Sequence, residues 1–372
     1  MLTLDDFVGR FDEEPGYLNF ARIGPLSLAV LEEQQSQLEL LRHARFGSLA
    51  VLDEQDQRVR SAVAALTGFR DDQIVFQPNA SAGLMHTMFG VTGGVLLSPR
   101  EFPSLPFAAT RASEALGVLN PIWLETDGGP ITPGLIRDQL TKNVAAVAVS
   151  LVDYRTGYLV DLEGIRQVIG DRLLIVDAIQ GFSVVDAPFQ VADVVVSGGQ
   201  KWVRSGWGTG FLALSDRAAE SLIPVVSGWT GSAGDPFDGV PAPATGASAY
   251  QVSNPDPLAQ ARFAMALEDV ASVGVGAIGG LIAEKVSRVI ELADDFAVPV
   301  ISSRAEHERA GFVVVEPAPD QLTMLTASLF NHGITATTRF GTVRFSAHVS
   351  TNDETFEMLQ AAFTSFASAI TV

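Results

Sequence analysis

The chain has 372 residues, 47% of them hydrophobic and 18% charged, and its formal net charge at pH 7 is −19. This length is more than one compact core usually holds, so we expect two lobes. The acidity argues against a nucleic-acid-binding protein and against a membrane-surface protein, because both would present a basic face to phosphates. Because the chain contains no cysteine, disulfides, thiolate metal sites and a cysteine nucleophile are excluded, and we predict no metal site.

Two further features concern the compartment. The longest apolar runs, such as residues 144–152, are too short to cross a bilayer. The N-terminal segment is acidic and does not resemble a secretory signal. Together with the lack of cysteine, these features favour a cytoplasmic protein.

From about residue 70 to residue 215, short apolar runs alternate with amphipathic segments. Strands are predicted at residues 94–98, 120–125, 145–152, 173–178, 192–197 and 210–214. Helices are predicted between several of them, at residues 103–117, 132–142 and 161–170. This alternation predicts an α/β domain with a mostly parallel sheet and helices on both faces. Ligands bind such sheets at the carboxyl ends of the strands.

Residues 228–257 interrupt the pattern, because they are rich in Gly, Pro, Ala and Ser and contain no periodic apolar run. A long irregular segment of this kind is usually functional or a connector. After it we expect helices at 258–274, 277–296, 321–333 and 353–370 and strands at 311–316 and 342–348. These elements predict a second, smaller α+β lobe.

A lysine and an aspartate each follow an apolar strand of the predicted sheet. Lys201 lies among small residues directly after one strand, and Asp177 ends another. Most lysines are solvated, so Lys201 alone could be an ordinary loop residue. A carboxylate at a buried strand end is costly unless it pairs with a cation or serves a ligand, although Asp177 could also cap a turn.

Two more features resemble parts of a ligand site. Near residue 76 a strand ends, and a helix is expected from about residue 82 with Asn79 or Ser81 as its cap. The N–H groups at such a helix start bind phosphate well, although most caps serve only their own helix. Phe102 follows the strand at 94–98 and could stack on a flat ring or lie in the core.

Arg344 interrupts an otherwise apolar strand of the small lobe. A guanidinium in such a strand usually has a carboxylate partner, which a substrate or the protein can supply. Within the protein, the nearby Asp353 and Glu354 are the candidates, and Arg339 is a rival for the substrate role.

A phosphate cradle, a ring-stacking aromatic residue, a carboxylate and a lysine are what pyridoxal phosphate requires. Its aldehyde forms a Schiff base with a lysine, and its pyridine nitrogen needs an acidic partner.

Three motifs extend this interpretation: 17-YLNFARIGPLS-27, 176-VDAIQG-181 and 197-SGGQKW-202 with Gly206, Gly208 and Gly210 after it. With them, the chain resembles the class V aminotransferase family of fold-type-I pyridoxal-phosphate enzymes, which includes cysteine desulfurases, kynureninases and isopenicillin-N-epimerase-like proteins. The resemblance implies a large domain over residues 16–257 with a mostly parallel seven-stranded sheet. It also implies a smaller α+β domain formed by residues 1–15 and 258–372.

The resemblance also implies roles for individual residues. Lys201 and Asp177 are the implied catalytic residues, Asp177 for the pyridine nitrogen and Gln180 for the ring hydroxyl. The kynureninase-like segments 150–162, 227–231 and 251–256 add four residues that reach the cofactor or substrate. The implied cofactor-binding set is Asn79, Ala80, Ser81, Phe102, Asp153, Asp177, Gln180, Ser197, Gln200, Lys201, Trp229, Ser253 and Asn254. The implied substrate-binding set is Asn19, Arg344 and Arg339.

Several positions depart from family patterns. Gln200 stands where His or Tyr often precedes the lysine, Gly198 where Ser or Thr often binds phosphate, and Gln180 where kynureninases have His. Cysteine desulfurases need a cysteine to carry sulfur, and this chain has none. The reaction therefore stays open.

We predict a class V aminotransferase-like enzyme that acts on a small α-amino acid. The alternatives are a kynureninase-like C–C hydrolase, a C–S β-lyase or epimerase, and a cofactor-binding protein without catalysis. The family resemblance further implies a homodimer with composite active sites, in which the segment containing Ser253 comes from the neighbouring subunit. No nucleic-acid or membrane partner is expected.

Overall fold

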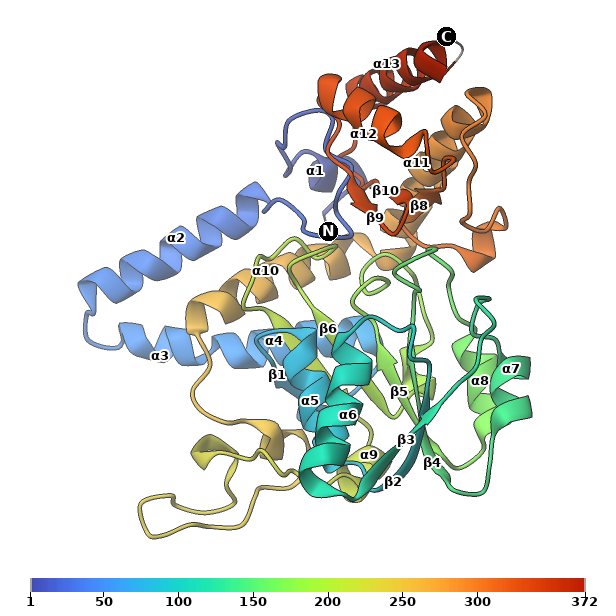
Figure 1. Ribbon diagram of the computed structural model, residues 1–372. Helices are drawn as coiled ribbons and strands as arrows, with labels where there is room; N and C mark the ends of the chain where they lie inside the picture. Colours follow the sequence, from blue (N-terminus) through green and yellow to red (C-terminus); the bar gives the residue numbers. More distant parts are fainter. Residues whose placement is uncertain (1, 371–372) are drawn as a thin grey trace.

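A seven-stranded sheet forms the centre of the large lobe in the computed structural model, which describes residues 2–370 (Figure 1). Across the sheet, the strands follow the order β1 (Ile74–Phe76), β7 (Gly210–Leu214), β6 (Val194–Gly198), β5 (Leu173–Asp177), β4 (Val144–Ser150), β2 (Gly93–Leu97) and β3 (Leu119–Trp123). Strand β7 runs antiparallel to both neighbours, and the other pairs are parallel. The predicted α/β class with a mostly parallel sheet is confirmed, and the six predicted strands lie within two residues of their expected bounds.

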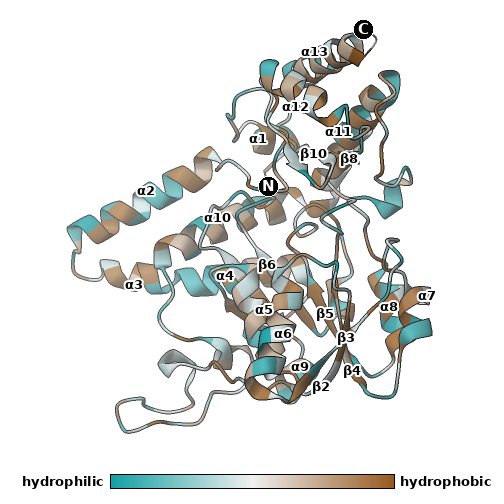
Figure 2. Cartoon of the chain, in the orientation of Figure 1, coloured by the Kyte–Doolittle hydropathy of each residue, from teal (hydrophilic) through white to brown (hydrophobic). Residues whose placement is uncertain are grey.

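Both faces of this sheet are buried, because successive side chains of a strand point to opposite sides. In β4, Val147 and Val149 join one apolar cluster, and Ala146 and Ala148 join another. Figure 2 shows the central strands as mostly hydrophobic ribbons. The large-lobe helices that connect the strands are α5 (Ala80–Gly90), α6 (Ser104–Leu116), α7 (Pro133–Gln139) and α8 (Leu162–Ile169), and α9 (Asp216–Ser221) follows β7.

Four helices precede the sheet: α1 (Leu4–Val8), α2 (Leu28–His43), α3 (Ser48–Asp53) and α4 (Gln55–Thr67). Helices α2 and α3 extend away from the sheet on the left of Figure 1. The long helix α10 (Pro257–Val273) runs beside α2 and α4. Short 3₁₀ helices occur at Asp71–Gln73, Phe189–Val191, Trp229–Gly231, Gly246–Tyr250 and Glu306–Glu308.

The small lobe is built on a three-stranded antiparallel sheet in the order β8 (Phe312–Val315), β10 (Thr342–Ser346) and β9 (Thr337–Arg339). Helices α11 (Val275–Asp295), α12 (Leu322–Asn331) and α13 (Asp353–Ile370) complete this α+β lobe, as predicted. The N-terminal segment joins it through a bridge between Asn19 and Ser346. Among residues 2–370, no single helix has the length and apolar composition of a membrane span, although α10 and α11, which meet at 86°, pass that test as a pair.

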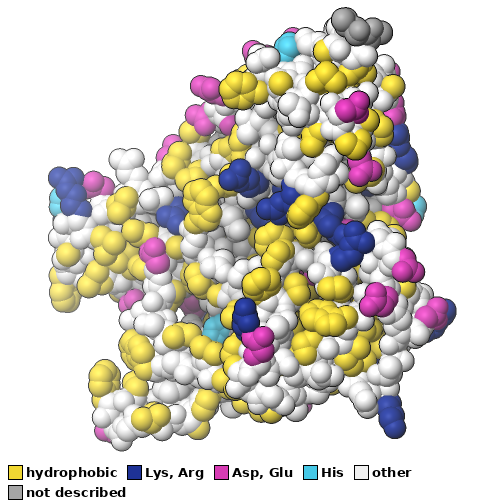
Figure 3. All heavy atoms as spheres, viewed as in Figure 1, with side chains coloured by type: hydrophobic (Ala, Val, Ile, Leu, Met, Phe, Trp, Pro, Cys, Tyr) yellow, Lys and Arg dark blue, Asp and Glu magenta, His cyan; other side chains and the backbone are white. Residues whose placement is uncertain are grey.

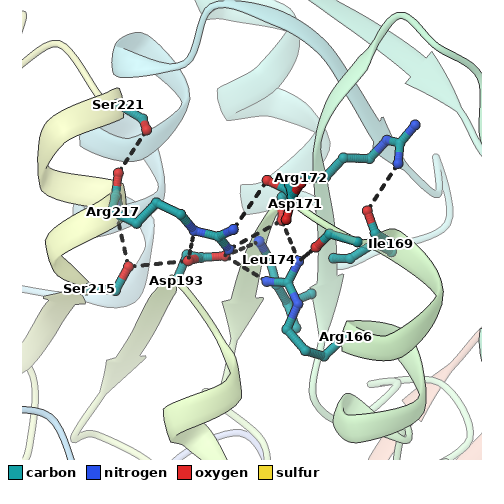
Figure 4. Close-up of polar contacts among 11 residues, drawn as sticks. Arg166, Ile169, Asp171, Arg172, Leu174, Asp193, Ser215, Arg217 and Ser221 are labelled. Atoms are coloured by element: carbon teal, nitrogen blue, oxygen red, sulfur yellow. Dashed lines mark hydrogen bonds and ion pairs between the residues drawn. The ribbon is translucent and has the colours of Figure 1, made fainter.

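A buried aspartate holds the elements at the amino end of β6 together (Figure 4). Asp193 is 4% exposed and directly precedes β6. Its carboxylate accepts hydrogen bonds from Arg166 on α8 at 2.9 Å, from Arg217 on α9 and from the N–H of Leu174 on β5 at 2.8 Å. These bonds fix β5 and β6 at the end of the sheet opposite to the predicted ligand site.

Candidate active site

Lys201 lies three residues beyond the carboxyl end of β6, in a tight turn. The turn is closed by hydrogen bonds from the Gly199 N–H to the Thr209 carbonyl and from the Ser205 N–H to the Gly199 carbonyl, both 2.9 Å. A Cβ at Gly199 would collide with the Ser205 hydroxyl, so this close approach requires glycine. Lys201 is 9% exposed and lines a cavity of about 670 Å³.

The Lys201 amine has no hydrogen bond or ion pair to any residue in the range 2–370, and its Nζ lies 5.5 Å from the centroid of the Phe102 ring. Burial lowers the pKa of Lys201 to about 8, while the charge of Asp177 acts in the opposite direction. A substantial share of the amine is therefore neutral near pH 8, which is the form that attacks a carbonyl carbon.

Asp177 is the last residue of β5 and is 1% exposed. Its Oδ1 accepts a hydrogen bond from the Ile179 N–H at 3.1 Å. Burial raises the pKa of Asp177, and this hydrogen bond and the charge of Lys201 partly offset the effect. A buried carboxylate without a contacting cation is what a pyridine N–H would complete.

Phe102 and Gln180 line the same cavity. Phe102 contacts Tyr154 edge-on, with ring centroids 5.3 Å apart and planes at 87°. The amide nitrogen of Gln180 donates to the Ala21 carbonyl at 2.9 Å, and its amide oxygen accepts from the Trp202 indole at 3.0 Å. Both side chains are thus held in place before a ligand arrives.

The predicted phosphate-binding residues meet where α5 begins. The Asn79 side chain caps the helix by accepting from the Ala82 N–H at 2.9 Å, so the helix starts at Ala80, two residues earlier than predicted. The N–H groups of Ala80 and Ser81 have no intrahelical acceptor. A Cβ at Gly198 would lie 3.5 Å from the Ala80 nitrogen and would clash with the Gln200 side chain, so the end of β6 approaches this helix start closely.

Ser197 and Ser81 have local partners. Ser197 is fully buried, and its hydroxyl faces the Gly198 carbonyl at 3.5 Å. The Ser81 hydroxyl pairs with that of Ser104 at 2.7 Å. Ser197 lies outside the set of residues that line the Lys201 cavity.

Arg344 and Arg339 line the cavity from the small lobe. An Nη of Arg344 donates to the Tyr154 carbonyl at 3.1 Å, and its guanidinium lies 5.1 Å from the centroid of the Phe312 ring. Its Nε is buried and has no hydrogen-bond partner. Burial, with a smaller contribution from Arg339, lowers the pKa of Arg344 to about 10.

The proposed internal partners of Arg344 are not in contact with it. Asp353 pairs with Arg288 on α11, because the start of α13 faces that helix and not β10. Within residues 2–370 Arg344 forms no ion pair, so no carboxylate oxygen lies within 4.0 Å of its guanidinium nitrogens. The nearby acids are paired elsewhere, Asp353 with Arg288 and Asp153 with Arg155.

Asn19 and Asp153 lie beside the cavity without lining it. Asn19 is 5% exposed and accepts a hydrogen bond from the Thr337 hydroxyl at 2.6 Å. Asp153 pairs with Arg155 at 3.3 Å and caps the turn that follows β4. Asn19 and Asp153 thus hold side chains that line the cavity, those of Thr337 and Arg155.

Three predicted residues lie elsewhere. Ser253 and Asn254 line a separate cavity of about 400 Å³ together with Gln77 and His86. Trp229 is 50% exposed and lines neither cavity. A single chain therefore does not bring these three residues to Lys201.

Some residues of the site escaped the sequence interpretation. Arg22, Arg100 and Arg155 line the Lys201 cavity, and Arg100 follows β2, so its position at a strand end was a usable signal. Glu101 is buried next to Arg100 in the sequence, and one of its carboxylate oxygens accepts from the Ser150 N–H at 3.0 Å. Burial raises the pKa of Glu101 to about 7.

Comparison with known proteins agrees with this geometry. The family model "Aminotransferase class-V" matches residues 42–232. A cysteine desulfurase from Thermococcus onnurineus NA1 has a similar fold, with a TM-score of 0.83, 20% identity and 93% of each chain covered. The cystine C–S lyase C-DES matches with a TM-score of 0.84, 17% identity and 94% and 97% coverage of the two chains. The cysteine desulfurase CsdA from Escherichia coli matches with a TM-score of 0.80, 17% identity and 99% coverage of each chain. No curated protein sequence matches this chain.

Proposed function

Since this chain belongs to the class V aminotransferase family, whose cofactor is pyridoxal 5′-phosphate, we propose that it transfers the amino group of a small α-amino acid. The observation that carries the proposal is a buried lysine without a partner, facing a cavity beside a buried carboxylate without a contacting cation. Each group is costly to bury alone, and a ligand that offers a carbonyl carbon and a protonated ring nitrogen would satisfy both.

The residues present fit this cofactor. The free N–H groups at the start of α5, with the Gln200 side chain close by, suit its phosphate. The Phe102 ring at the cavity wall suits stacking on a pyridine ring, and the Gln180 amide suits its hydroxyl. The buried Asp177 carboxylate suits its ring nitrogen, and the Lys201 amine suits its aldehyde.

Bound pyridoxal phosphate supplies an aldehyde for the substrate amine and a ring that withdraws electrons from the carbon bearing it. The Asp177 carboxylate keeps the ring nitrogen protonated, which maintains that withdrawal. The lowered pKa of Lys201 lets its amine take a proton from the substrate α-carbon and return it elsewhere. The Arg344 guanidinium, which lacks an acidic partner, binds and orients the substrate carboxylate.

A lyase that eliminates a β-substituent is the second candidate, and the fold shared with a cystine C–S lyase supports it. Both reactions begin with removal of the α-proton, so the same residues serve either one. A cysteine desulfurase reaction is disfavoured, because this chain contains no cysteine to receive the sulfur.

The experiment incubates the cofactor-loaded protein with a panel of amino acids, with and without a 2-oxo acid acceptor. A transaminase forms a new amino acid only when the acceptor is present, whereas a lyase releases ammonia without it. A folded, cofactor-loaded protein that converts no amino acid by either route would overturn the enzymatic proposal.

We also propose that two copies associate and share their active sites. The support is the placement of Ser253 and Asn254 away from Lys201 of their own chain. The irregular segment 228–257 exposes large apolar side chains, with Phe237 at 89% and Val240 at 102% exposure. Exposed apolar residues at such density usually mark a contact surface.

A further inference from the structure

The cavity that contains Lys201 is unusually rich in arginine. Five guanidinium groups line it, from Arg22, Arg100, Arg155, Arg339 and Arg344. The acidic residue in its lining is the exposed Glu316. The chain as a whole carries a formal net charge of −19, so the lining of this cavity has the opposite sign to the chain. Figure 3 shows Lys and Arg side chains gathered between the two lobes on the face drawn.

Most arginines of this chain are already engaged with the protein. Arg58, Arg166 and Arg217, for example, bind buried or half-buried carboxylates, and Arg172 and Arg262 donate to backbone carbonyls. Among the described residues, most guanidinium groups that line the Lys201 cavity lack such carboxylate partners.

In the described range 2–370, Arg22, Arg100 and Arg339 form no ion pair, and no hydrogen bond from their guanidinium groups is present. Arg155 differs from them, because Asp153 pairs with it at 3.3 Å. The Arg100 guanidinium lies against Gly128, which has φ +84° and carries no side chain to cover it. These cations are therefore free to bind an anion from solution.

The cavity arginines that lack a carboxylate partner among the described residues differ in their burial. Arg344 is partly buried, with a donor already fixed on the Tyr154 carbonyl, and it is the group assigned above to the substrate α-carboxylate. Arg22, Arg100 and Arg339 are exposed and come from three separate segments of the chain. One α-carboxylate satisfies one guanidinium in a paired planar contact, so the three exposed groups remain for another anion.

We infer that the substrate is an amino acid whose side chain carries a second anionic group, a carboxylate or a phosphate, bound by Arg22, Arg100 and Arg339. This inference rests on the proposed function, because it names the substrate class of that same site. Guanidinium groups bind both kinds of anion through paired N–H donors, and a cavity of this sign also attracts such substrates from solution.

The test compares acidic amino acids with their neutral counterparts of similar shape: glutamate with glutamine, aspartate with asparagine, and phosphoserine with serine. Each is titrated into the cofactor-loaded protein, and the change in the visible absorption band gives the dissociation constant. We expect the acidic member of at least one pair to bind about 10-fold more tightly or better, because each charged hydrogen bond contributes to that extent. The pair with the largest ratio identifies the anion as carboxylate or phosphate. Equal binding within all three pairs overturns the inference and leaves the proposed function intact.

A second measurement is independent of any reaction. Calorimetric titration compares glutarate, which has two carboxylates and no amine, with butyrate, which has one. Tighter binding of glutarate supports the inference even if no amino acid is converted, and equal binding contradicts it.

Variants locate the anion site. Arg22→Gln, Arg100→Gln and Arg339→Gln should each lower the ratio of acidic to neutral binding by about 5-fold or more, since each removes one exposed charge-assisted contact. Arg45→Gln is the matched control, because Arg45 is exposed outside this cavity, between α2 and α3. If all three cavity variants keep the ratio of the parent protein, as the control should, the second anion does not bind there.

Discussion

Asp177 and Lys201 lie at the carboxyl ends of the adjacent strands β5 and β6, both buried, and no hydrogen bond or ion pair joins them. The two charges nevertheless influence each other, since Asp177 raises the pKa of Lys201 and Lys201 lowers that of Asp177. In each case burial has the larger effect and favours the neutral form. Burial thus acts against the charged form of both residues, and each of them remains available to a ligand.

The first prediction concerns the reactivity of Lys201 in the cofactor-free protein. Its pKa lies near 8, below the ordinary lysine value of 10.5, so the amine is protonated below about pH 8 and free above it. Acetylation by trace acetic anhydride, followed by peptide mass spectrometry, should therefore rise through a midpoint near pH 8. The exposed Lys142 in the same digest is the reference for reagent reactivity.

Asp177→Asn tests the direction in which Asp177 shifts the labelling midpoint of Lys201. Because the Asp177 carboxylate raises the pKa of Lys201, its removal should shift the labelling midpoint to lower pH. A midpoint that stays near 10.5 in the parent protein, or that moves upward in Asp177→Asn, would contradict this account of the site.

Asp177→Asn should also abolish most of the activity while leaving the fold intact. The amide keeps the shape of the carboxylate and its bond from the Ile179 N–H, so the melting temperature should change little. The amide cannot hold a proton on a pyridine nitrogen, so we expect the rate to fall by about 100-fold or more. Rates are compared at equal cofactor occupancy, measured by absorbance. Activity close to that of the parent protein would mean that Asp177 is an ordinary turn residue.

The strongest apolar runs of the sequence predicted most of the sheet correctly, because a buried parallel strand is apolar on both faces. Strands β1 and β9 are harder to recognise in the sequence, since each has three residues and β9 is largely exposed. Helix α2 was missed because its apolar positions form no consistent stripe, and Leu31 and Leu38 remain exposed. Length and periodicity therefore decided which elements could be recognised.

Some residues of the site could likewise be identified from the sequence, and others could not. Asp177 ends β5, and Lys201 and Phe102 follow β6 and β2 within five residues, so the rule that ligands bind at strand ends identified them. The cavity arginines come from distant segments that only the folded chain brings together. A segment-by-segment interpretation also could not show that Asp353 faces Arg288 and not Arg344, because that depends on how α13 packs.

Asp193→Asn should destabilise the protein without touching the active site. The aspartate is buried and binds Arg166 and Arg217, and an amide would leave these cations without their charge partner. Breaking such a buried pair costs ~3 kcal/mol in the free energy of unfolding, which chemical denaturation measures. Asp294→Asn is the control, because its pair with Arg304 is exposed and should contribute less than about 1 kcal/mol. Equal stability of the two variants would show that the Asp193 network does not hold the strands.

The shared-site proposal predicts that two inactive variants restore each other. Lys201→Ala removes the amine, and Asn254→Ala removes a residue that lies away from the Lys201 cavity of its own chain. If each site combines Lys201 of one copy with Asn254 of the other, mixed dimers hold one intact site, and about a quarter of the activity returns after subunit exchange. A stable and active monomer by light scattering, or no recovery on mixing, would refute the shared site.

Arg344→Lys separates a substrate-binding role from a structural one. Lysine keeps a positive charge at this position but cannot make the paired planar contact with a carboxylate, so apparent substrate affinity should weaken by about 10-fold or more. The guanidinium contributes one hydrogen bond, to the Tyr154 carbonyl, and packs on Phe312, so the melting temperature should fall only slightly. Cofactor occupancy should stay unchanged, because the residues assigned to the cofactor lie in the large lobe.

The opposite pattern would assign Arg344 to the fold. A clear loss of stability with unchanged substrate affinity would mean that the contacts with Tyr154 and Phe312 are its main purpose. Arg339→Lys is the matched comparison, because Arg339 is exposed, lines the same cavity and lies on the neighbouring strand β9. If the substrate α-carboxylate binds Arg344, the loss of affinity for a neutral amino acid should be larger in Arg344→Lys than in Arg339→Lys. The reverse order would move the carboxylate to Arg339, where the guanidinium is more hydrated and the contact correspondingly weaker.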